Sequence, residues 1–173
     1  QGLKIDGNNT TYTATNNYGI NLASSSGNTI TGNTFNNNNY SIYLSSSSDN
    51  TIIGNTCKNN NTGIRLNSSS NNTITGNTCN NNSYGIRLNS SSSNNTVTGN
   101  TCNNNTEGIY LFSSNNNTIT GNTCIRGTGL ATDYTASQHT IHLVGTGNNY
   151  NLIAMNNCMG KAVTNEGGTG NTL

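Results

Sequence analysis

Proline and tryptophan are absent from this 173-residue sequence, and charged residues make up only 6% of it. Six Lys and Arg stand against five Asp and Glu, so the formal net charge is +1 and no basic surface indicates nucleic-acid binding. No apolar run approaches the roughly 18 residues that a membrane-spanning helix needs. We therefore expect no nucleic-acid partner and no membrane span.

Hydrophobic residues are also scarce, at 29% of the chain, a composition that alone is typical of disorder. A disordered chain, however, normally carries a high net charge, whereas this sequence is nearly neutral and periodic. The motif Asn-Thr-Ile-Thr-Gly-Asn-Thr at residues 28–34 returns about every 22 residues, with weaker copies at Ile5 and Leu173. Its aliphatic position is occupied in turn by Ile30, Ile52, Ile74, Val97, Ile119 and Ile153. The period predicts an ordered repeat protein.

A second motif, Gly-Ile-x-Leu, recurs between the copies of the first, most clearly at residues 63–66 and 85–88. Apolar and polar residues alternate in both motifs, which indicates β-strands, and the Ser- and Asn-rich segments between them favour turns. One coil cannot bury its own apolar side chains, so successive coils must stack in parallel at about 4.8 Å. We predict an all-β fold, a right-handed parallel β-helix (solenoid) of about six to seven coils of about 22 residues.

The domain organisation follows from the same repeat. We predict a single β-helix domain over residues 1–173, with an insertion at about residues 126–140 where one repeat interval is longer. The chain begins with Gln1 rather than Met and ends at Leu173 inside a repeat, so we expect a processed chain or a fragment.

Stacking predicts columns of like residues inside the rod. One column contains Phe35, Cys57, Cys79, Cys102, Cys124 and Cys158, which we interpret as small buried hydrophobes because parallel Cβ vectors disfavour disulfides. No His on that face and no Cys-x-x-Cys spacing indicates a metal, and we expect no metal site and no cofactor. A hydrogen-bonded asparagine ladder is predicted at Asn33, Asn55, Asn77, Asn100, Asn122 and Asn156.

Repeats written Asn-x-Ile-x-Gly-Asn with Gly-Ile-x-Leu resemble those of the NosD-like and pectate-lyase-like β-helix repeat proteins, over about residues 2–173. The resemblance implies the fold strongly and the activity weakly, because that superfamily includes cell-surface proteins, phage-tail components, polysaccharide lyases and hydrolases. It also implies an extracellular or surface-associated location.

One outward face of the predicted rod is rich in Tyr and Arg. The outward residue of the second motif reads, coil by coil, Asn21, Tyr43, Arg65, Arg87, Tyr110 and His142, and the file before it reads Tyr18, Tyr40, Thr62, Tyr84, Glu107 and His139. Aromatic faces stack on sugars, Arg donates forked hydrogen bonds, and both anchor protein interfaces. We predict a glycan- or protein-binding site at Tyr43, Arg65, Tyr84, Arg87, Tyr110 and His142. The alternative is that β-propensity alone placed these residues on an exposed strand.

A second outward face carries a two-file array of threonines: Thr29, Thr31, Thr51, Thr73, Thr75, Thr96, Thr98, Thr118 and Thr120. Files on a flat β-helix lie roughly 7 Å apart along the strand and about 4.8 Å apart across coils. Such Thr-x-Thr arrays resemble those of β-solenoid ice-binding (antifreeze) proteins. Threonine is also an ordinary choice for any exposed strand, so both interpretations stay open.

Few residues suit catalysis. The acidic residues are Asp6, Asp49, Glu107, Asp133 and Glu166, and no two fall in one column on neighbouring coils, as paired carboxylates for glycoside hydrolysis would require. His139 and His142 could bind a metal or act as acid and base, but we interpret them as solvent-facing residues at the edge of the insertion.

The leading hypothesis is a non-catalytic extracellular β-helix module, similar to surface or phage-tail proteins, that binds glycan or a surface protein. Its open ends leave unpaired backbone groups, which favours a homo-oligomer or an end-to-end assembly. The alternatives are an ice-binding protein that uses the threonine face, and a polysaccharide lyase or glycoside hydrolase.

Overall fold

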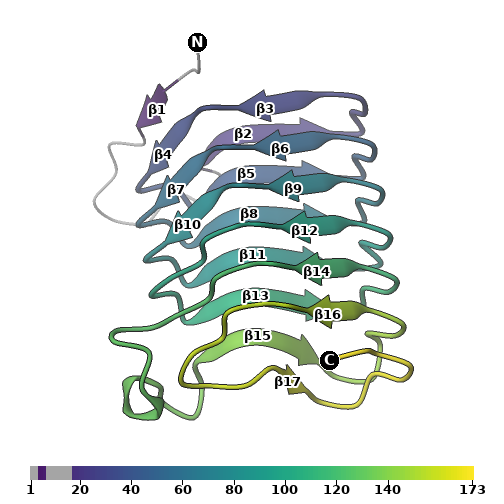
Figure 1. Ribbon diagram of the computed structural model, residues 1–173. Coiled ribbons are helices and arrows are strands. Elements are labelled where there is room, and N and C mark those ends of the chain that lie inside the picture. The colour runs from purple at the N-terminus through teal and green to yellow at the C-terminus, as the bar shows by residue number, and fades with distance from the viewer. Residues whose placement is uncertain (1–3, 7–16) are drawn as a thin grey trace.

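The computed structural model describes residues 4–6 and 17–173. This part of the chain forms a parallel β-solenoid of about seven turns, with successive turns about 22 residues apart, which confirms the predicted β-helix repeat fold. Figure 1 shows the turns stacked from the N-terminal to the C-terminal end of the rod. No described segment is a helix long and apolar enough to cross a membrane.

The strands of successive turns pair in parallel in three sheets. The seven-stranded sheet consists of β2 (Tyr18–Ala23), β5 (Tyr40–Ser45), β8 (Thr62–Asn67), β11 (Tyr84–Asn89), β13 (Glu107–Phe112), β15 (His139–Val144) and β17 (Thr164–Asn165). The six-stranded sheet consists of β3 (Thr29–Thr31), β6 (Thr51–Ile53), β9 (Thr73–Thr75), β12 (Thr96–Thr98), β14 (Thr118–Thr120) and β16 (Leu152–Ala154). The four-stranded sheet consists of β1 (Lys4–Asp6), β4 (Thr34–Asn36), β7 (Thr56–Lys58) and β10 (Thr78–Asn80).

The prediction for Ile5 was wrong. We expected Ile5 to be a weak copy of the Ile30 position, but β1 pairs with β4 and places Ile5 opposite Phe35. The reason is the order of strands along each turn, which is four-stranded sheet, seven-stranded sheet, six-stranded sheet. A strand that directly precedes β2 must therefore belong to the four-stranded sheet.

The core is a narrow stack of aliphatic and cysteine side chains. The predicted columns are confirmed by register, for example Ile52 opposite Ile74 and Cys57 opposite Cys79. All five cysteines are free, and four of them are buried, while Cys158 is half-buried. Burial, followed by the hydrogen bond with Cys79, raises the pKa of the Cys57 thiol well above its ordinary value. The pKa values of the Cys79 and Cys102 thiols are also raised well above the ordinary value, so these three thiols stay protonated and act as small apolar residues.

The predicted asparagine ladder is present at one corner of the coil. The Asn55 side chain illustrates the pattern: its amide donates to Oδ1 of Asn77 at 3.0 Å, and that same oxygen accepts the Asn55 backbone N–H at 2.9 Å. The amide of Asn55 also donates to the carbonyl of Ile30 in the turn before, at 2.9 Å. Each rung therefore satisfies buried polar groups in three successive turns.

Two further ladders, which we did not predict, occupy the other two corners. One joins side chains from Asn28 to Asn50, Asn72, Asn95, Asn117, Asn151 and Asn171. The other runs through Asn38, Asn60, Asn82 and Asn105. Each of the three corners of the coil therefore contains a column of hydrogen-bonded asparagines, and the apolar core lies between these columns.

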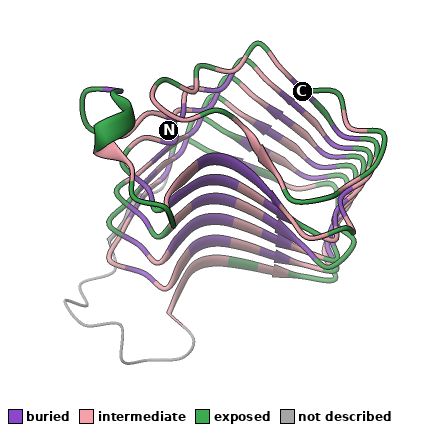
Figure 2. Cartoon of the chain, turned by 90° about the horizontal axis from the view of Figure 1, so that it is seen from below, coloured by how far each residue is buried: buried purple, intermediate pink, exposed green. Residues whose placement is uncertain are grey.

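The long strands of the seven-stranded sheet bend toward the interior of the rod, as Figure 2 shows along its axis. In β11 the bend interrupts the alternation of buried and exposed residues, because Gly85 and Ile86 are both buried. A Cβ atom on Gly85 would lie 2.5 Å from the Gly108 carbonyl oxygen and 3.1 Å from the Cys102 Cβ. Glycine therefore lets the bent strand approach the cysteine column closely.

The predicted insertion leaves the rod between Cys124 and β15 and contains the short 3-10 helix η1 (Ala131–Asp133). The Asp133 carboxylate accepts the N–H groups of Thr128 and Leu130 at 2.8 and 3.1 Å. The Lys161 ammonium donates to carbonyls of Thr135, at 3.2 Å, and of two nearby residues. Asp133 and Lys161 therefore hold the insertion in place, which accounts for two of the few charged residues.

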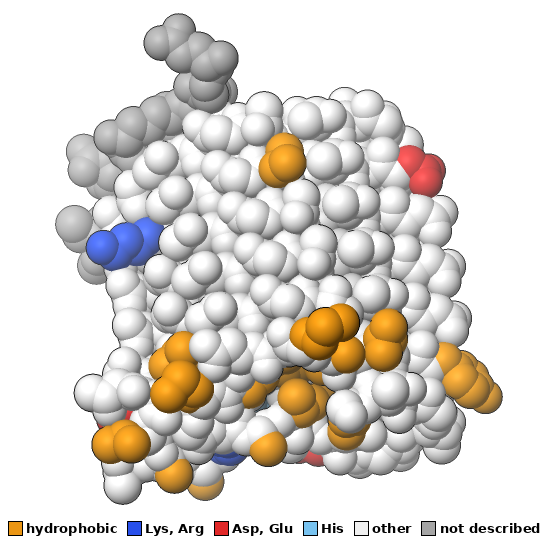
Figure 3. Space-filling model, in the orientation of Figure 1, with side chains coloured by type: hydrophobic (Ala, Val, Ile, Leu, Met, Phe, Trp, Pro, Cys, Tyr) orange, Lys and Arg blue, Asp and Glu red, His pale blue; other side chains and the backbone are white. Residues whose placement is uncertain are grey.

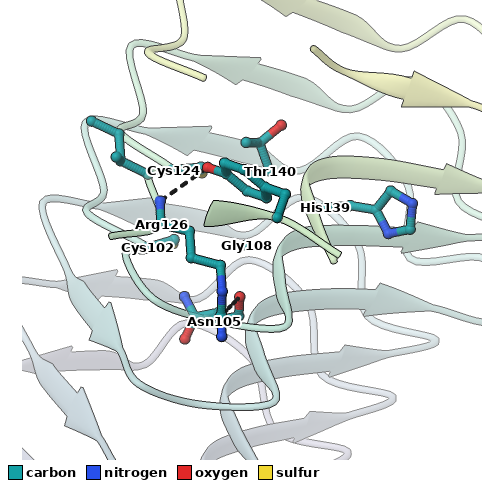
Figure 4. A pocket seen from close by; sticks show the side chains of 9 residues that line it. Cys102, Asn105, Gly108, Cys124, Arg126, His139 and Thr140 are labelled. Carbon is teal, nitrogen blue, oxygen red and sulfur yellow. Dashed lines mark hydrogen bonds between the residues drawn. The ribbon is translucent and has the colours of Figure 1, made fainter. Parts of the chain in front are cut away.

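The insertion packs against the rod over a small enclosed space (Figure 4). Tyr134 lies across it, and its hydroxyl accepts the backbone N–H of Arg126 at 2.9 Å. The Arg126 guanidinium donates to the carbonyl of Asn105 at 3.1 Å. The space leaves no room for a water molecule, and the His139 ring points away from it. This contact joins the insertion to the rod and offers no ligand pocket.

Candidate functional site

The outer face of the seven-stranded sheet carries the predicted Tyr and Arg residues, and strand pairing places them in two adjacent files. Arg65 lies opposite Arg87, Arg87 opposite Tyr110, and Tyr110 opposite His142. Tyr84 lies in the neighbouring file. We call the surface formed by the following side chains the aromatic–arginine strip: Tyr18, Tyr40, Tyr43, Arg65, Tyr84, Arg87 and Tyr110.

Both guanidinium groups of the strip lie against tyrosine rings. The Cζ atom of Arg65 is 5.0 Å from the ring centroid of Tyr40 and 5.3 Å from that of Tyr43. The Cζ atom of Arg87 is 4.5 and 5.1 Å from the ring centroids of Tyr84 and Tyr110. Such cation–π contacts favour one orientation of each guanidinium group against its tyrosine rings.

Hydrogen bonds use only some of the donors of these two arginines. Nη1 of Arg65 donates to the Tyr40 hydroxyl at 2.7 Å, and Nε of Arg87 donates to Asn89 Oδ1 at 3.0 Å. Neither guanidinium group has a carboxylate partner among residues 4–6 and 17–173. Two oriented positive charges therefore remain available to an external anion.

Tyrosine rings fill the N-terminal part of the strip. The rings of Tyr18, Tyr40 and Tyr43 stack on one another with centroids 5.4 to 5.5 Å apart and interplanar angles of 14 to 27°. Further along, Tyr84 and Tyr110 meet edge to face at 5.2 Å. All these side chains are half-buried, so they offer both ring surface and hydroxyl groups to a ligand.

A cluster of two carboxylates and two imidazoles lies at the C-terminal end of the strip; we call Glu107, His139, His142 and Glu166 the carboxylate–histidine cluster. Glu107 Oε1 is 3.2 Å from Nδ1 of His139 and from Nδ1 of His142. On the other side of the ring, Nε2 of His142 is 3.0 Å from Glu166 Oε1. The His142 ring also meets Tyr110 edge to face at 5.9 Å.

The prediction that both histidines face solvent was wrong for His142, which is only 6% exposed. Glu107 and Glu166 lie at its two nitrogens, the His139 ring lies 3.9 Å from it between centroids, and Tyr110 meets it edge to face, so the ring is enclosed by its own partners. Burial lowers the pKa of His139, against the opposing effect of the Glu107 charge. The hydrogen bond from His142 lowers the pKa of Glu166, which therefore remains ionised at neutral pH.

Sequence reasoning missed this cluster. Glu166 follows β17, whose residues carry neither repeat motif, yet β17 pairs with β15 and places Asn165 opposite Leu143. The insertion separates Glu107 from His139 by 32 residues, although β13 pairs with β15 and places them directly opposite each other. The repeat predicted that Glu107 and His139 lie in one column, but it did not predict that Glu166 completes a cluster with His142.

The threonine face lies on the outer side of the six-stranded sheet, and its register is as predicted, for example Thr73 opposite Thr96 and Thr75 opposite Thr98. Figure 3, which views the rod from this side, shows a surface with few apolar side chains in its upper part. Thr29 and Thr31 are exposed, and the other seven predicted threonines are half-buried. The array is interrupted by Ile53 and ends at Leu152 and Ala154.

The sequence profile of the family described as periplasmic copper-binding protein (NosD) matches residues 1–160. No curated protein gives a significant match.

Among solved structures, a double mutant of the periplasmic alginate epimerase AlgG is 26% identical with a TM-score of 0.69, over 80% of this chain and 32% of that one. A single-substitution mutant of the same enzyme is also 26% identical, with a TM-score of 0.64, over 78% and 30% of the two chains. The A-module of the Azotobacter vinelandii mannuronan C-5 epimerase AlgE6 is 16% identical with a TM-score of 0.58, over 99% and 54%, and supports the fold alone. The chain thus spans about a third of the length of the AlgG structures.

Proposed function

This chain belongs to the NosD family of periplasmic copper-binding proteins, and we propose that it is a periplasmic or extracellular β-helix. We propose further that it binds an acidic polysaccharide on the aromatic–arginine strip. The observation that carries the proposal is the pair Arg65 and Arg87, held between tyrosine rings without a carboxylate partner in the described part of the chain. A carboxylated sugar supplies that partner.

The chemistry of the strip suits such a ligand. A guanidinium group binds a carboxylate through two parallel hydrogen bonds, and tyrosine rings stack on sugar rings. Arg65 and Arg87 occupy neighbouring strands, β8 and β11, in register, so the two charges repeat along the rod at about 4.8 Å per strand. A linear polymer lying along the rod axis would meet them in succession.

The similar solved structures support the choice of polymer to be tested. The AlgG structures are those of an alginate epimerase, and alginate carries a carboxylate on every sugar. The likeness to AlgG covers only part of that enzyme, so we take from it the ligand class and not the reaction. Alginate is accordingly the first ligand to test.

We expect alginate to bind the wild-type protein, and the double variant Arg65→Ala/Arg87→Ala to bind about 100-fold more weakly, because each of the two guanidinium–carboxylate contacts contributes about 1.5 kcal/mol. Isothermal titration calorimetry with alginate oligomers measures the affinity. The variant Arg65→Lys/Arg87→Lys keeps both charges but loses the forked geometry, and should fall between the two.

The matched control is Lys58→Ala, which removes one positive charge from an exposed position in β7 of the four-stranded sheet and should leave alginate affinity unchanged. A neutral dextran should not bind. Equal alginate affinity of the wild type and the double arginine variant would contradict the proposal. Shortened chains or altered sugars after incubation with alginate, seen by size-exclusion chromatography and NMR, would contradict its non-catalytic part.

Ice binding by the threonine face is a second candidate function, favoured by the two in-register threonine files on β9, β12 and β14. If it is correct, the protein should show thermal hysteresis, and Thr98→Tyr should abolish it because a large ring interrupts the flat array. The Arg65→Ala/Arg87→Ala variant, altered on another face, serves as the control. Absence of hysteresis and of ice-recrystallisation inhibition at high protein concentration would contradict this function.

Copper, which the family description names, requires accessible nitrogen, oxygen or sulfur donors. The cysteine column does not fit, because Cys57, Cys79, Cys102 and Cys124 are buried among apolar residues. The carboxylate–histidine cluster does fit, because two imidazoles and a carboxylate come together on the outer side of the sheet, with Glu107 and His139 partly exposed. Glu107, His139 and His142 would hold the ion there, and the ion would bind oxygen ligands from solvent.

A further inference from the structure

We propose that Glu107, His139 and His142 form a binding site for a divalent transition-metal ion and that Glu166 orients His142 within it. Cu(II) is the ion that this site should bind most tightly. From the sequence we expected no metal site, because we interpreted His139 and His142 as solvent-facing residues at the edge of the insertion. The fold brings them together across the insertion. This site is independent of polysaccharide binding.

Two of the three donor–donor distances match those around a metal ion. Glu107 Oε1 is 3.2 Å from Nδ1 of His139 and from Nδ1 of His142, and one ligand atom from each of the three residues lies within 4.8 Å of the others. Two ligands bound at about 2.0–2.1 Å, at angles between square-planar and tetrahedral, lie about 2.9–3.4 Å apart. The Glu107 oxygen therefore stands at a ligand–ligand distance from each histidine nitrogen.

The partners of His142 match those of a metal-binding histidine. Nε2 of His142 lies 3.0 Å from Glu166 Oε1. On the other side of the ring, Nδ1 lies 3.2 Å from the Glu107 carboxylate. A histidine that donates its other N–H to a carboxylate is the usual arrangement at metal centres.

The scaffold holds the ligands in place. Glu107 begins β13, and both histidines lie on the adjacent parallel strand β15. Between the histidines, Ile141 is fully buried, and the Thr140 hydroxyl donates to the Lys161 carbonyl at 2.9 Å. The side chains of Glu107, His139 and His142 are only 12, 13 and 8% exposed. A site on packed strands keeps its geometry before the ion arrives.

The donor set selects the kind of ion. Two imidazoles and one carboxylate suit first-row transition metals rather than calcium or magnesium, which prefer oxygen ligands. Among divalent ions, affinity for a given set of nitrogen and oxygen ligands peaks at Cu(II). Two formal negative charges, on Glu107 and Glu166, are present to balance the charge of the ion.

The test is a titration of the metal-free protein, prepared without a polyhistidine tag, with Cu(II) and separately with Zn(II). We expect one Cu(II) per chain, an electron paramagnetic resonance spectrum with hyperfine coupling to two imidazole nitrogens, and weaker binding of Zn(II). His139→Ala/His142→Ala should weaken Cu(II) binding by more than about 100-fold, and Glu166→Gln, which changes only the orienting partner, by about 10-fold.

The matched control is Asp49→Asn, which removes an exposed carboxylate from a corner of the rod. Asn71 and Asn94 occupy the same corner in later turns with the same positive φ, so the substitution suits the backbone there. The Cu(II) affinity of this variant should equal that of the wild type. Circular dichroism verifies the fold of each variant, and His139→Ala alone is the test if the double variant does not fold. The proposal is overturned if the wild type binds no Cu(II), or if the histidine variants keep its affinity and spectrum.

Discussion

Replacing Asn77 with alanine should lower the free energy of unfolding by about 4 kcal/mol, because it leaves several buried polar groups without partners at about 1–3 kcal/mol each. The Asn77 side chain makes five hydrogen bonds within the ladder. Its oxygen accepts both the backbone N–H and the side-chain amide of Asn55. Its amide donates to the carbonyls of Ile52 and Thr75 and to Asn100.

Urea unfolding followed by circular dichroism measures the loss. The matched control is Asn67→Ala, the same substitution on the outer face of β8, where the side chain is half-buried and makes no hydrogen bond within the described residues; it should change stability by less than about 0.5 kcal/mol. Equal unfolding midpoints for the two variants would show that water replaces the hydrogen bonds of Asn77 with little loss of stability. That result would contradict the proposed contribution of the asparagine ladder to the free energy of unfolding.

Gly85→Ala should destabilise the protein by about 3 kcal/mol, the upper part of the range for overpacking a well-packed core. The added Cβ would lie 2.5 Å from the Gly108 carbonyl oxygen and 2.7 Å from Nδ2 of Asn105. The first atom belongs to the backbone of the next strand and the second is part of an asparagine ladder, so neither can move freely. Strand β11 must therefore straighten or lose pairing with β13.

Thermal unfolding of Gly85→Ala compared with Ser41→Ala provides the measurement. Ser41 occupies the corresponding position of β5, pairing in the same sheet, and already has a Cβ, so its truncation should cost less than about 1 kcal/mol. If Gly85→Ala unfolds at the wild-type temperature, the bend has more room than the structure indicates. Since β11 also carries Tyr84 and Arg87, a straightened strand should weaken alginate binding as well.

Much of the fold was predictable because repeats that stack must place like residues above one another. The register of Ile64 and Ile86, or of Arg65 and Arg87, follows directly from their separation by one repeat. The same logic placed the ladder of Asn33 in the correct column. Stacking turns a periodic sequence into known neighbours, and so the composition of each outer face could be read before the structure.

The features that escaped prediction have identifiable causes. Asparagine is so common in the turns that two of the three ladders could not be distinguished from ordinary corner residues, although Asn50 and Asn72 recur at a fixed place in the first motif. The carboxylate–histidine cluster depends on Glu166, in a turn without either motif, and on the burial of His142 by its partners. Periodicity predicts which residues are neighbours, and it does not predict which side chains turn toward each other.

The asparagine ladders also have a polarity. In the Asn33 ladder every side chain-to-side chain hydrogen bond runs from the amide nitrogen of one turn to the asparagine oxygen of the next turn, so these bonds share one direction along the rod axis and polarise one another. At the N-terminal end Asn33 Oδ1 is buried and has no partner among the described residues. One end of the column therefore presents a hydrogen-bond acceptor and the other a donor. Any further coil or second molecule that continues the ladder must have the same orientation along the rod axis.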